Sequence, residues 1–146
     1  MNNSSEEKDI LLAEDDQDDV DIFKWAMEKT GVPHSVRHAH NGEVLFVLLK
    51  EKIPYILFLD IEMPCKDGLS CILEIRKNRD YDNLPVIVYS SYAYDKYVED
   101  TYRSGANLYI SKAGSIEHIV ANLKKVFAID WKKYMHYPCR DDFHLS

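Results

Sequence analysis

The sequence has no excess of positive charge, few cysteines and no long apolar run. Its 25 acidic residues outnumber its 18 basic ones, giving a net charge of -7, and this disfavours sequence-independent binding to nucleic acid or anionic lipid. The three cysteines form no CxxC pair, which fits a reducing compartment better than a disulfide framework. We therefore expect partners that are proteins or cations.

Segments that would direct the chain to a membrane are also missing. The N-terminus, MNNSSEEKD, is polar and acidic, unlike a signal peptide, and no apolar stretch approaches the roughly 18 residues that cross a bilayer. We expect a cytoplasmic protein. Its 146 residues suit one domain, which we place at residues 9–128, between a flexible N-terminus (1–8) and a C-terminal tail (129–146).

Short apolar runs alternate with amphipathic segments along the chain. The runs predict strands at residues 10–13, 34–39, 55–60, 84–90 and 107–111. The segments that follow them have apolar residues at helical spacing and predict helices at residues 17–31, 41–52, 68–80, 93–105 and 115–127. This strict alternation predicts an α/β fold, a doubly wound five-stranded parallel sheet with five helices on its two faces.

Polar side chains gather where the predicted strands end. They are Glu14, Asp15 and Asp16 after the first strand, Asp60 after the third, Ser90 and Ser91 at the fourth, and Ser111 and Lys112 at the fifth. Because doubly wound sheets bind ligands at the carboxyl ends of their strands, we expect these side chains to converge. The phosphate loops GxGxxG and GxxxxGK[ST] do not occur.

Carboxylates that face one another repel, and a hard divalent cation, by default Mg²⁺, relieves the repulsion. Asp15 is the first choice as a direct ligand, with Glu14 or Asp16 acting through water and the backbone carbonyl of Glu62 joining them. Such a metal orients a phosphoryl group, and Asp60 is the best nucleophile to accept one.

Lys112 and Ser90 complete the predicted site. The Lys112 ammonium would pair with one phosphoryl oxygen and the Ser90 hydroxyl would donate a hydrogen bond to another.

These residues resemble the receiver domain of two-component response regulators, the CheY-like superfamily. The resemblance runs from about residue 9 to residue 128 and rests on Glu14-Asp15, on LDIEMPCKDG around Asp60, and on Ser90, Tyr109 and Lys112. It implies a flavodoxin-like strand order, 2-1-3-4-5. It also implies that a histidine kinase or phosphotransfer protein phosphorylates Asp60 with Mg²⁺, and that the protein catalyses only its own phosphorylation and dephosphorylation. Nothing of domain size follows the receiver, so the chain is similar to single-domain, phytochrome-associated regulators.

The resemblance implies a route for the signal as well. Ser90 would move toward the phosphoryl group, and Tyr109, the switch aromatic, would turn inward and change the face made by the fourth helix, fifth strand and fifth helix. A downstream protein or a second copy would bind there. Tyrosines near this helix suit such a partner: Tyr92, Tyr94, Tyr97 and Tyr102.

The match departs from the family pattern in three places. Lys112 precedes Ala113 instead of the proline that often follows through a cis bond, which leaves open how firmly Lys112 is held. Ser91 stands where alanine is frequent. Glu62 and Tyr92 occupy the two variable positions that flank the site, so the lifetime of the phosphoryl group stays open.

Other interpretations of these residues fit the sequence less well. A small-molecule phosphatase that forms an aspartyl phosphate would use a DxDx[TV] loop, whereas Asp60 is followed by IEMP. A degenerate receiver is disfavoured because the acids, Asp60 and Lys112 are all present. The remaining acids of the first helix are interpreted as a solvated helix start, namely Asp18, Asp19 and Asp21. The histidines and Cys139 match no compact zinc site; the residues are His38, His40, His136, Cys139 and His144.

The tail after Ala128 is too short for an output domain, but it is rich in aromatic residues. These are Trp131, Tyr134, Tyr137 and Phe143. We expect them to pack back on the fifth helix or to extend a dimer contact.

Overall fold

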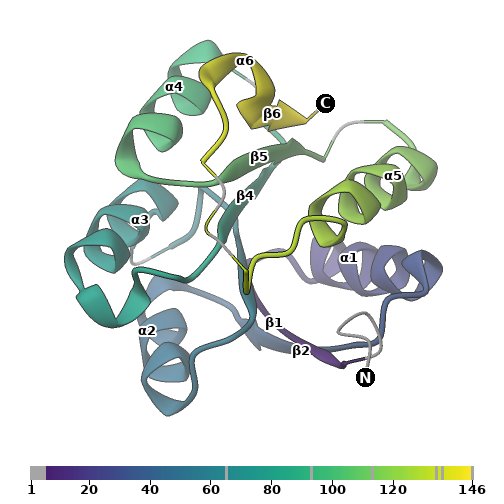
Figure 1. Ribbon diagram of the computed structural model, residues 1–146, viewed down its shortest axis with the longest axis horizontal. Helices are drawn as coiled ribbons and strands as arrows, with labels where there is room; N and C mark the ends of the chain where they lie inside the picture. The colour runs from purple at the N-terminus through teal and green to yellow at the C-terminus, as the bar shows by residue number, and fades with distance from the viewer. Residues whose placement is uncertain are drawn as a thin grey trace.

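The structure is a computed structural model that describes residues 6–64, 66–92, 94–112, 114–133, 135 and 137–145. Strands and helices alternate along the chain (Figure 1). The strands are β1 (Lys8–Ala13), β2 (His34–Ala39), β3 (Ile56–Leu59), β4 (Val86–Ser90), β5 (Leu108–Ser111) and β6 (His144–Leu145). The helices are α1 (Gln17–Thr30), α2 (Gly42–Glu51), α3 (Gly68–Lys77), α4 (Asp95–Ser104), α5 (Ile116–Phe127) and α6 (Arg140–Phe143), with a 3₁₀ turn, η2 (Arg79–Tyr81).

The sheet is parallel throughout, in the order β2-β1-β3-β4-β5-β6. The doubly wound architecture and the order 2-1-3-4-5 are thereby confirmed. Figure 1 shows α1 and α5 on one face of the sheet and α2, α3 and α4 on the other. The direction of winding reverses between β1 and β3, so the carboxyl ends of these two strands flank the crevice in which such folds bind ligands.

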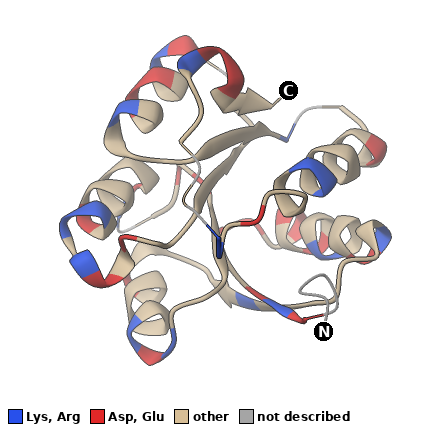
Figure 2. Ribbon diagram, viewed as in Figure 1, with Lys and Arg blue, Asp and Glu red and all other residues tan. Residues whose placement is uncertain are grey.

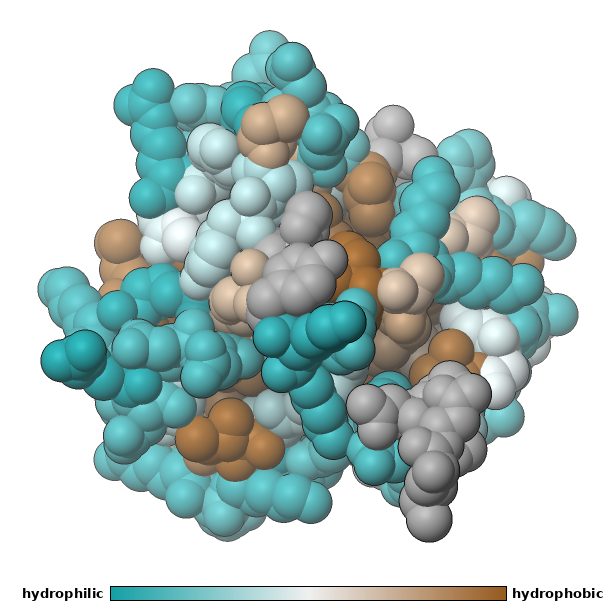
Figure 3. All heavy atoms as spheres, in the orientation of Figure 1, coloured by the Kyte–Doolittle hydropathy of each residue, from teal (hydrophilic) through white to brown (hydrophobic). Residues whose placement is uncertain are grey.

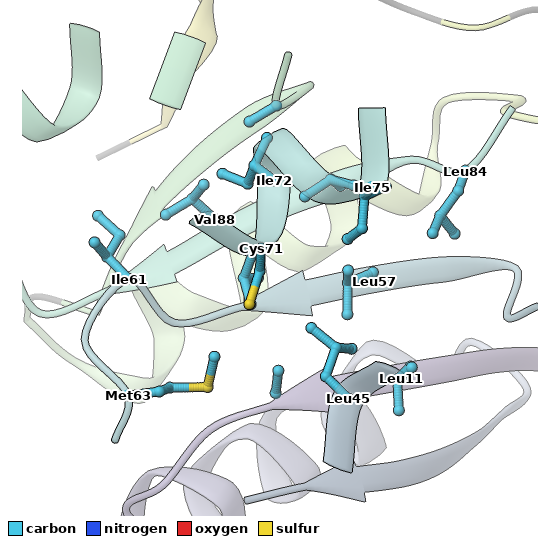
Figure 4. Close-up of a cluster of buried hydrophobic side chains, with 14 of the residues drawn as sticks. Leu11, Leu45, Leu57, Ile61, Met63, Cys71, Ile72, Ile75, Leu84 and Val88 are labelled. Carbon is cyan, nitrogen blue, oxygen red and sulfur yellow. The ribbon is translucent and has the colours of Figure 1, made fainter. Parts of the chain in front are cut away.

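Apolar side chains fill both spaces between the sheet and the helices. On one side, Leu11 and Leu57 of the strands point toward Leu45 of α2 and toward Ile72 and Ile75 of α3 (Figure 4). Fully burying each such side chain contributes roughly 1.5–3 kcal/mol. Charged residues lie mainly on the helices, whereas the central strands β3, β4 and β5 are uncharged (Figure 2). This distribution explains why the strands appear in the sequence as continuous apolar runs.

The tail is part of the fold and supplies a strand that the sequence did not predict. β6 pairs with β5, with His144 opposite Tyr109. Phe143 is fully buried in the core. A strand of two residues is too short to show a hydrophobic alternation in the sequence. It forms because the exposed edge of β5 offers a place to pair.

The beginning of the tail packs on α5. Trp131 is buried, and its indole N–H donates to the backbone carbonyl of Val126 at 3.1 Å. This contact agrees with the expectation for the tail, whereas the residues after Pro138 lie instead against α4 and β5. Tyr134 and His136 are outside the described residues.

The segment that joins α5 to α6 crosses the near side of the sheet in Figure 1, where the strands begin. On that side, apolar side chains gather near the middle of the surface within a hydrophilic surround (Figure 3). None of the helices in the described part of the chain is long and apolar enough to span a membrane.

Candidate functional site

The sheet itself positions three residues of the predicted site. Glu14, Asp60 and Lys112 directly follow β1, β3 and β5, and each backbone amide still donates to a carbonyl oxygen of the neighbouring strand, at 2.9, 3.0 and 2.8 Å respectively. Their side chains therefore leave the same edge of the sheet from fixed backbone positions.

The loop after Asp60 folds back tightly because residue 68 is glycine. The backbone amide of Gly68 donates to the carbonyl of Ile61 at 2.7 Å. A Cβ atom at this position would lie 2.5 Å from the carbonyl oxygen of Asp60, so any larger residue would displace the loop. Asp67 then caps α3 by accepting from the amide of Ser70. The MPCKDG segment thus brings the start of α3 against the end of β3.

Three acids form the cluster that the sequence predicted. Carboxylate oxygens of Glu14, Asp15 and Asp60 all lie within 4.8 Å of one another. Glu14 and Asp60 are buried and Asp15 is exposed, so the cluster opens to solvent on one side. Oxygen ligands of this kind fit a hard divalent cation.

Asp16 does not join the cluster. Its Oδ1 accepts from the backbone amide of Asp18 at 2.8 Å and caps α1, so this carboxylate is already engaged. The amide of Glu62 donates to Oδ1 of Asp60 at 3.4 Å, and the Glu62 side chain is exposed. The predicted roles of Asp16 through water and of the Glu62 carbonyl stay predictions.

Lys112 is held at the centre of the site. Its Nζ forms an ion pair with Glu14, lies 3.0 Å from Oδ2 of Asp19 and 3.9 Å from Oδ2 of Asp60. The side chain is 5% exposed. Lys112 is therefore firmly placed although no proline follows it, while Ala113 and the bond before it are outside the described residues.

Asp19 corrects the sequence interpretation, which treated it as part of a solvated helix start. It is half-buried and pairs with Lys112. Its neighbour Val20 and the residue one turn later, Phe23, are both buried. Helical spacing therefore places Asp19 on the edge of α1 that borders the sheet, and this spacing was the signal that could have identified it.

Burial changes the acid strength of the clustered groups. Burial and, next to it, the nearby Asp60 raise the pKa of Glu14 to about 8, although Lys112 opposes the shift. Burial also raises the pKa of Asp60. Burial of Lys112 opposes its charge, yet Asp60 and Glu14 outweigh this and raise the pKa of the ammonium group. One cation is thus too few for the acids around it, which favours either a proton or a metal ion in the cluster.

Comparisons with known proteins agree with this geometry. Residues 10–124 match the model of the response regulator receiver domain. The chain belongs to this receiver domain family. It is also 33% identical to a 14.6 kDa protein of Leptolyngbya boryana over 104 residues. This stretch is 71% of this chain and 78% of the relative.

Two response regulators of known structure are similar as well. Response regulator Rcp1 of Synechocystis is 24% identical over 123 residues, 80% of this chain and 84% of Rcp1. The crystal structure of its Mn²⁺-bound form has a TM-score of 0.74 at 22% identity and covers 90% of this chain and 99% of that one. The crystal structure of the phosphorylated cyanobacterial phytochrome response regulator RcpA has a TM-score of 0.75 at 25% identity. This match covers 83% of this chain and 91% of the RcpA chain. The chain is therefore a receiver domain of two-component signalling.

The predicted switch residues of this receiver meet at Tyr92. Ser90 is fully buried and its Oγ accepts from the Tyr92 amide at 3.1 Å. Tyr109 donates its hydroxyl to the carbonyl oxygen of Tyr92. The Tyr109 ring is already packed inward, 6.3 Å from the ring of Phe143 and 5.2 Å from that of His144. The sequence led us to expect that Tyr109 turns inward on phosphorylation. In this structure the ring is already buried, so there is no exposed position from which it could turn.

The four tyrosines predicted to form a partner surface divide into two groups. Tyr92, Tyr94 and Tyr97 contact one another at the start of α4, with ring centroids 5.8–6.1 Å apart. Tyr102 instead packs on Phe143, and its hydroxyl donates to a tail carbonyl. Tyr102 faces the tail because it lies more than one helical turn beyond Tyr97.

The other candidate residues form no zinc site in the described part of the chain. His144 Nε2 shares a hydrogen bond with Ser111 Oγ at 2.6 Å, and Cys139 contacts Asp142. His38 contacts the carbonyl oxygen of Glu14.

Proposed function

We propose that this receiver is a phosphorylation switch in which Asp60 accepts a phosphoryl group from a histidine kinase or phosphotransfer protein in the cytoplasm. An Asp60 carboxylate oxygen attacks the phosphorus of a phosphohistidine. The phosphorus–nitrogen bond breaks, and the departing imidazole nitrogen keeps the electron pair and takes up a proton. The observation that carries this proposal is the position of Asp60: it is buried at the end of β3, inside the acid cluster and 3.9 Å from Lys112 Nζ.

Mg²⁺ is the cation that we assign to the acid cluster. Glu14, Asp15 and Asp60 would hold it, with Asp16 acting through water and the carbonyl of Glu62 as a further ligand. When bound, the ion would neutralise negative charge on the phosphoryl oxygens. Glu14 would then no longer need the Lys112 ammonium, which is free to pair with a phosphoryl oxygen.

Ser90 and Tyr109 would transmit the change. If Ser90 donates its hydroxyl to a phosphoryl oxygen, its position relative to the Tyr92 amide changes. Tyr109 would follow, because it is bonded to the carbonyl of the same residue. Phosphorylation can shift such an equilibrium only by its differential interaction with the two states. A coupling of about 1–3 kcal/mol would change partner affinity roughly 5- to 150-fold.

The output surface in this proposal is the face of α4, β5 and α5, where a downstream protein or a second copy would bind. In this proposal the receiver spans residues 9–128 and is followed by the tail of residues 129–146. The α6 helix and β6 strand of the tail border this face. A partner would therefore meet α4 together with the tail.

Phosphorylation by acetyl phosphate tests the proposal. Wild-type protein with Mg²⁺ should gain one phosphoryl group by intact-mass analysis, and Asp60→Asn should gain none. Asp82→Asn, which changes an exposed acid beside η2, is the matched control and should label normally. Labelling of Asp60→Asn equal to wild type would overturn the assignment.

The same preparation separates the switch from a small-molecule phosphatase. A switch retains its phosphoryl group and does not turn over a phosphate ester such as p-nitrophenyl phosphate continuously. Sustained release of p-nitrophenol that depends on Asp60 would favour the phosphatase instead.

A further inference from the structure

The tail already occupies part of the face assigned to output. β6 extends the sheet at the edge of β5, and Phe143 packs on Tyr102 and Tyr109. Arg140 pairs with Glu99 of α4 at 2.7 Å. The edge of β5 is therefore not open to an added strand. These groups of the tail do not contact the other end of α4, where the helix begins.

The start of α4 carries a stack of tyrosines that is largely exposed. The Tyr92 and Tyr94 rings are stacked with centroids 5.9 Å apart, and Tyr97 packs against both. Tyr94 is 64% exposed and Tyr92 39% exposed. Burying such rings against a partner would remove a large apolar area from water, and aromatic residues are enriched in the buried part of protein interfaces.

A groove of about 700 Å³ adjoins this stack. It lies between the β3–α3 loop and α4. Apolar groups line it together with acids and one lysine: Asp15, Ile61, Glu62, Met63, Pro64, Asp67, Leu69, Lys96, Tyr97 and Asp100.

The charge of the groove is negative and is not balanced within the chain. Even with Asp15 engaged by a metal, Glu62, Asp67 and Asp100 face a single cation, Lys96. None of these four residues forms an ion pair within the described ranges. Glu62 also raises the pKa of the Tyr92 phenol, so its negative charge is felt at the tyrosine stack. The complementary occupant is cationic.

We propose that this groove and the tyrosines of positions 92, 94 and 97 dock a segment of a partner protein that carries an arginine between apolar residues. A guanidinium can stack on a tyrosine face and bind a carboxylate through two parallel hydrogen bonds, which suits the Tyr97 and Asp100 pair better than an ammonium would. The apolar neighbours of the arginine cover Met63 and Leu69, which also line the groove.

Docking is also coupled to the phosphorylation site, and this part rests on the proposed function. Tyr92 is the link: its amide donates to Ser90 and its carbonyl accepts from Tyr109. When Ser90 turns to a phosphoryl oxygen, its Oγ moves away from the Tyr92 amide, and the tyrosine stack loses one of the two hydrogen bonds that hold it. Phosphorylation should therefore weaken docking.

The probe is an N-acetylated, C-amidated peptide, Gly-Leu-Arg-Leu-Gly, titrated into the full ¹⁵N-labelled chain and followed by NMR. We expect saturable shifts centred on Tyr94, Tyr97 and Asp100. The same peptide with citrulline, a neutral isostere of arginine, should bind at least about fivefold more weakly, because a charge-assisted hydrogen bond is lost.

Two variants localise the binding, and both change exposed or half-exposed side chains so that folding is retained. Asp100→Asn and Tyr94→Ala should each weaken binding at least about fivefold. Asp141→Asn, which removes an exposed acid of α6, is the control and should bind as wild type does. Equal binding of the citrulline peptide, insensitivity to both variants, or shifts centred outside the groove would overturn the proposal. Sedimentation in which the groove variants abolish self-association would assign the groove to a second copy and would overturn it too.

Beryllofluoride, a phosphoryl mimic, tests the coupling. Binding of the arginine peptide should weaken at least about fivefold with beryllofluoride and Mg²⁺, and no change or tighter binding would refute the route through Tyr92. The two proposals fail separately. Peptide binding without acetyl phosphate labelling of Asp60 would refute the phosphorylation switch alone, whereas labelling without peptide binding would refute the groove alone.

Discussion

The hydroxyl of Tyr109 on β5 donates a hydrogen bond to the backbone carbonyl oxygen of Tyr92, just before α4. Because the Tyr92 amide donates to Ser90 at the end of β4, this one residue joins both predicted switch side chains. The start of α4 is therefore tied to the edge of the sheet by two hydrogen bonds at a single residue. A change at either bond reaches the exposed tyrosine stack directly.

Removal of the Tyr109 hydroxyl tests this link. Tyr109→Phe keeps the ring packing on Phe143 but leaves the Tyr92 carbonyl without its donor, so urea unfolding should show a loss of about 0.5–1.5 kcal/mol. Acetyl phosphate labelling should be retained, because the hydroxyl does not touch Asp60. Tyr137→Phe, on an exposed side chain, should leave stability unchanged. A Tyr109→Phe protein as stable as wild type would show that the bond contributes nothing.

Stability of the metal-free protein should fall as pH rises, because of Glu14. The folded chain raises its pKa from 4.5 to about 8, so the folded state binds this proton more tightly than the unfolded state does. The stabilisation is complete below pH 4.5 and is lost as pH rises through about 8. The raised pKa of Asp60 acts in the same direction.

Thermal melts in EDTA across this range measure the effect. Glu14→Gln should show a weaker decline than wild type, and the exposed-site control Glu117→Gln should decline as wild type does. Mg²⁺ should stabilise wild type more at the alkaline end, since there it no longer competes with a proton. Identical pH dependence in Glu14→Gln and wild type would contradict the prediction.

Lys112 should affect phosphorylation and metal binding differently. Lys112→Ala removes the one ammonium that pairs with Glu14, Asp19 and Asp60. Mg²⁺ affinity, measured by titration, should be retained or increase because a competing cation is gone. Labelling by acetyl phosphate, or the change in partner binding that follows it, should weaken, because no ammonium group is left to pair with a phosphoryl oxygen. Asp15→Asn should instead weaken both, and a loss of Mg²⁺ binding in Lys112→Ala would refute this division.

The tail should contribute strongly to stability. Phe143→Ala leaves a cavity between Tyr102 and Tyr109 and should cost about 3–5 kcal/mol in urea unfolding. Truncation after Ala128 also exposes the edge of β5 and should cost more, or make the protein self-associate in sedimentation. Asp141→Asn changes an exposed tail residue and provides the control. Unchanged melting of the truncated chain would show that the docked tail is not part of the stable fold.

Much of the site could be predicted because it depends on local pattern. The apolar runs mark buried strands, and residues that end parallel strands must share one edge of the sheet, so Asp60, Glu14 and Lys112 were expected together. Asp19 was missed because its role depends on which side of α1 faces Lys112. Asp16 caps α1, and residue type alone does not separate a helix cap from a metal ligand, so its predicted role through water stays a prediction.

The sequence by itself determined the alternating fold, the strand-end acids and the family, since each follows from residue type and from spacing along a few residues. Only the tertiary structure decided that the tail forms β6, that Tyr102 turns to Phe143 while Tyr94 and Tyr97 stay beside the acidic groove, and that Tyr92 connects Ser90 with Tyr109. Apart from the local hydrogen bond between Ser90 and Tyr92, those contacts join residues that are distant in the sequence, such as Tyr92 with Tyr109 and Tyr102 with Phe143. Their formation depends on which surfaces the packed sheet leaves exposed, and no local pattern encodes that.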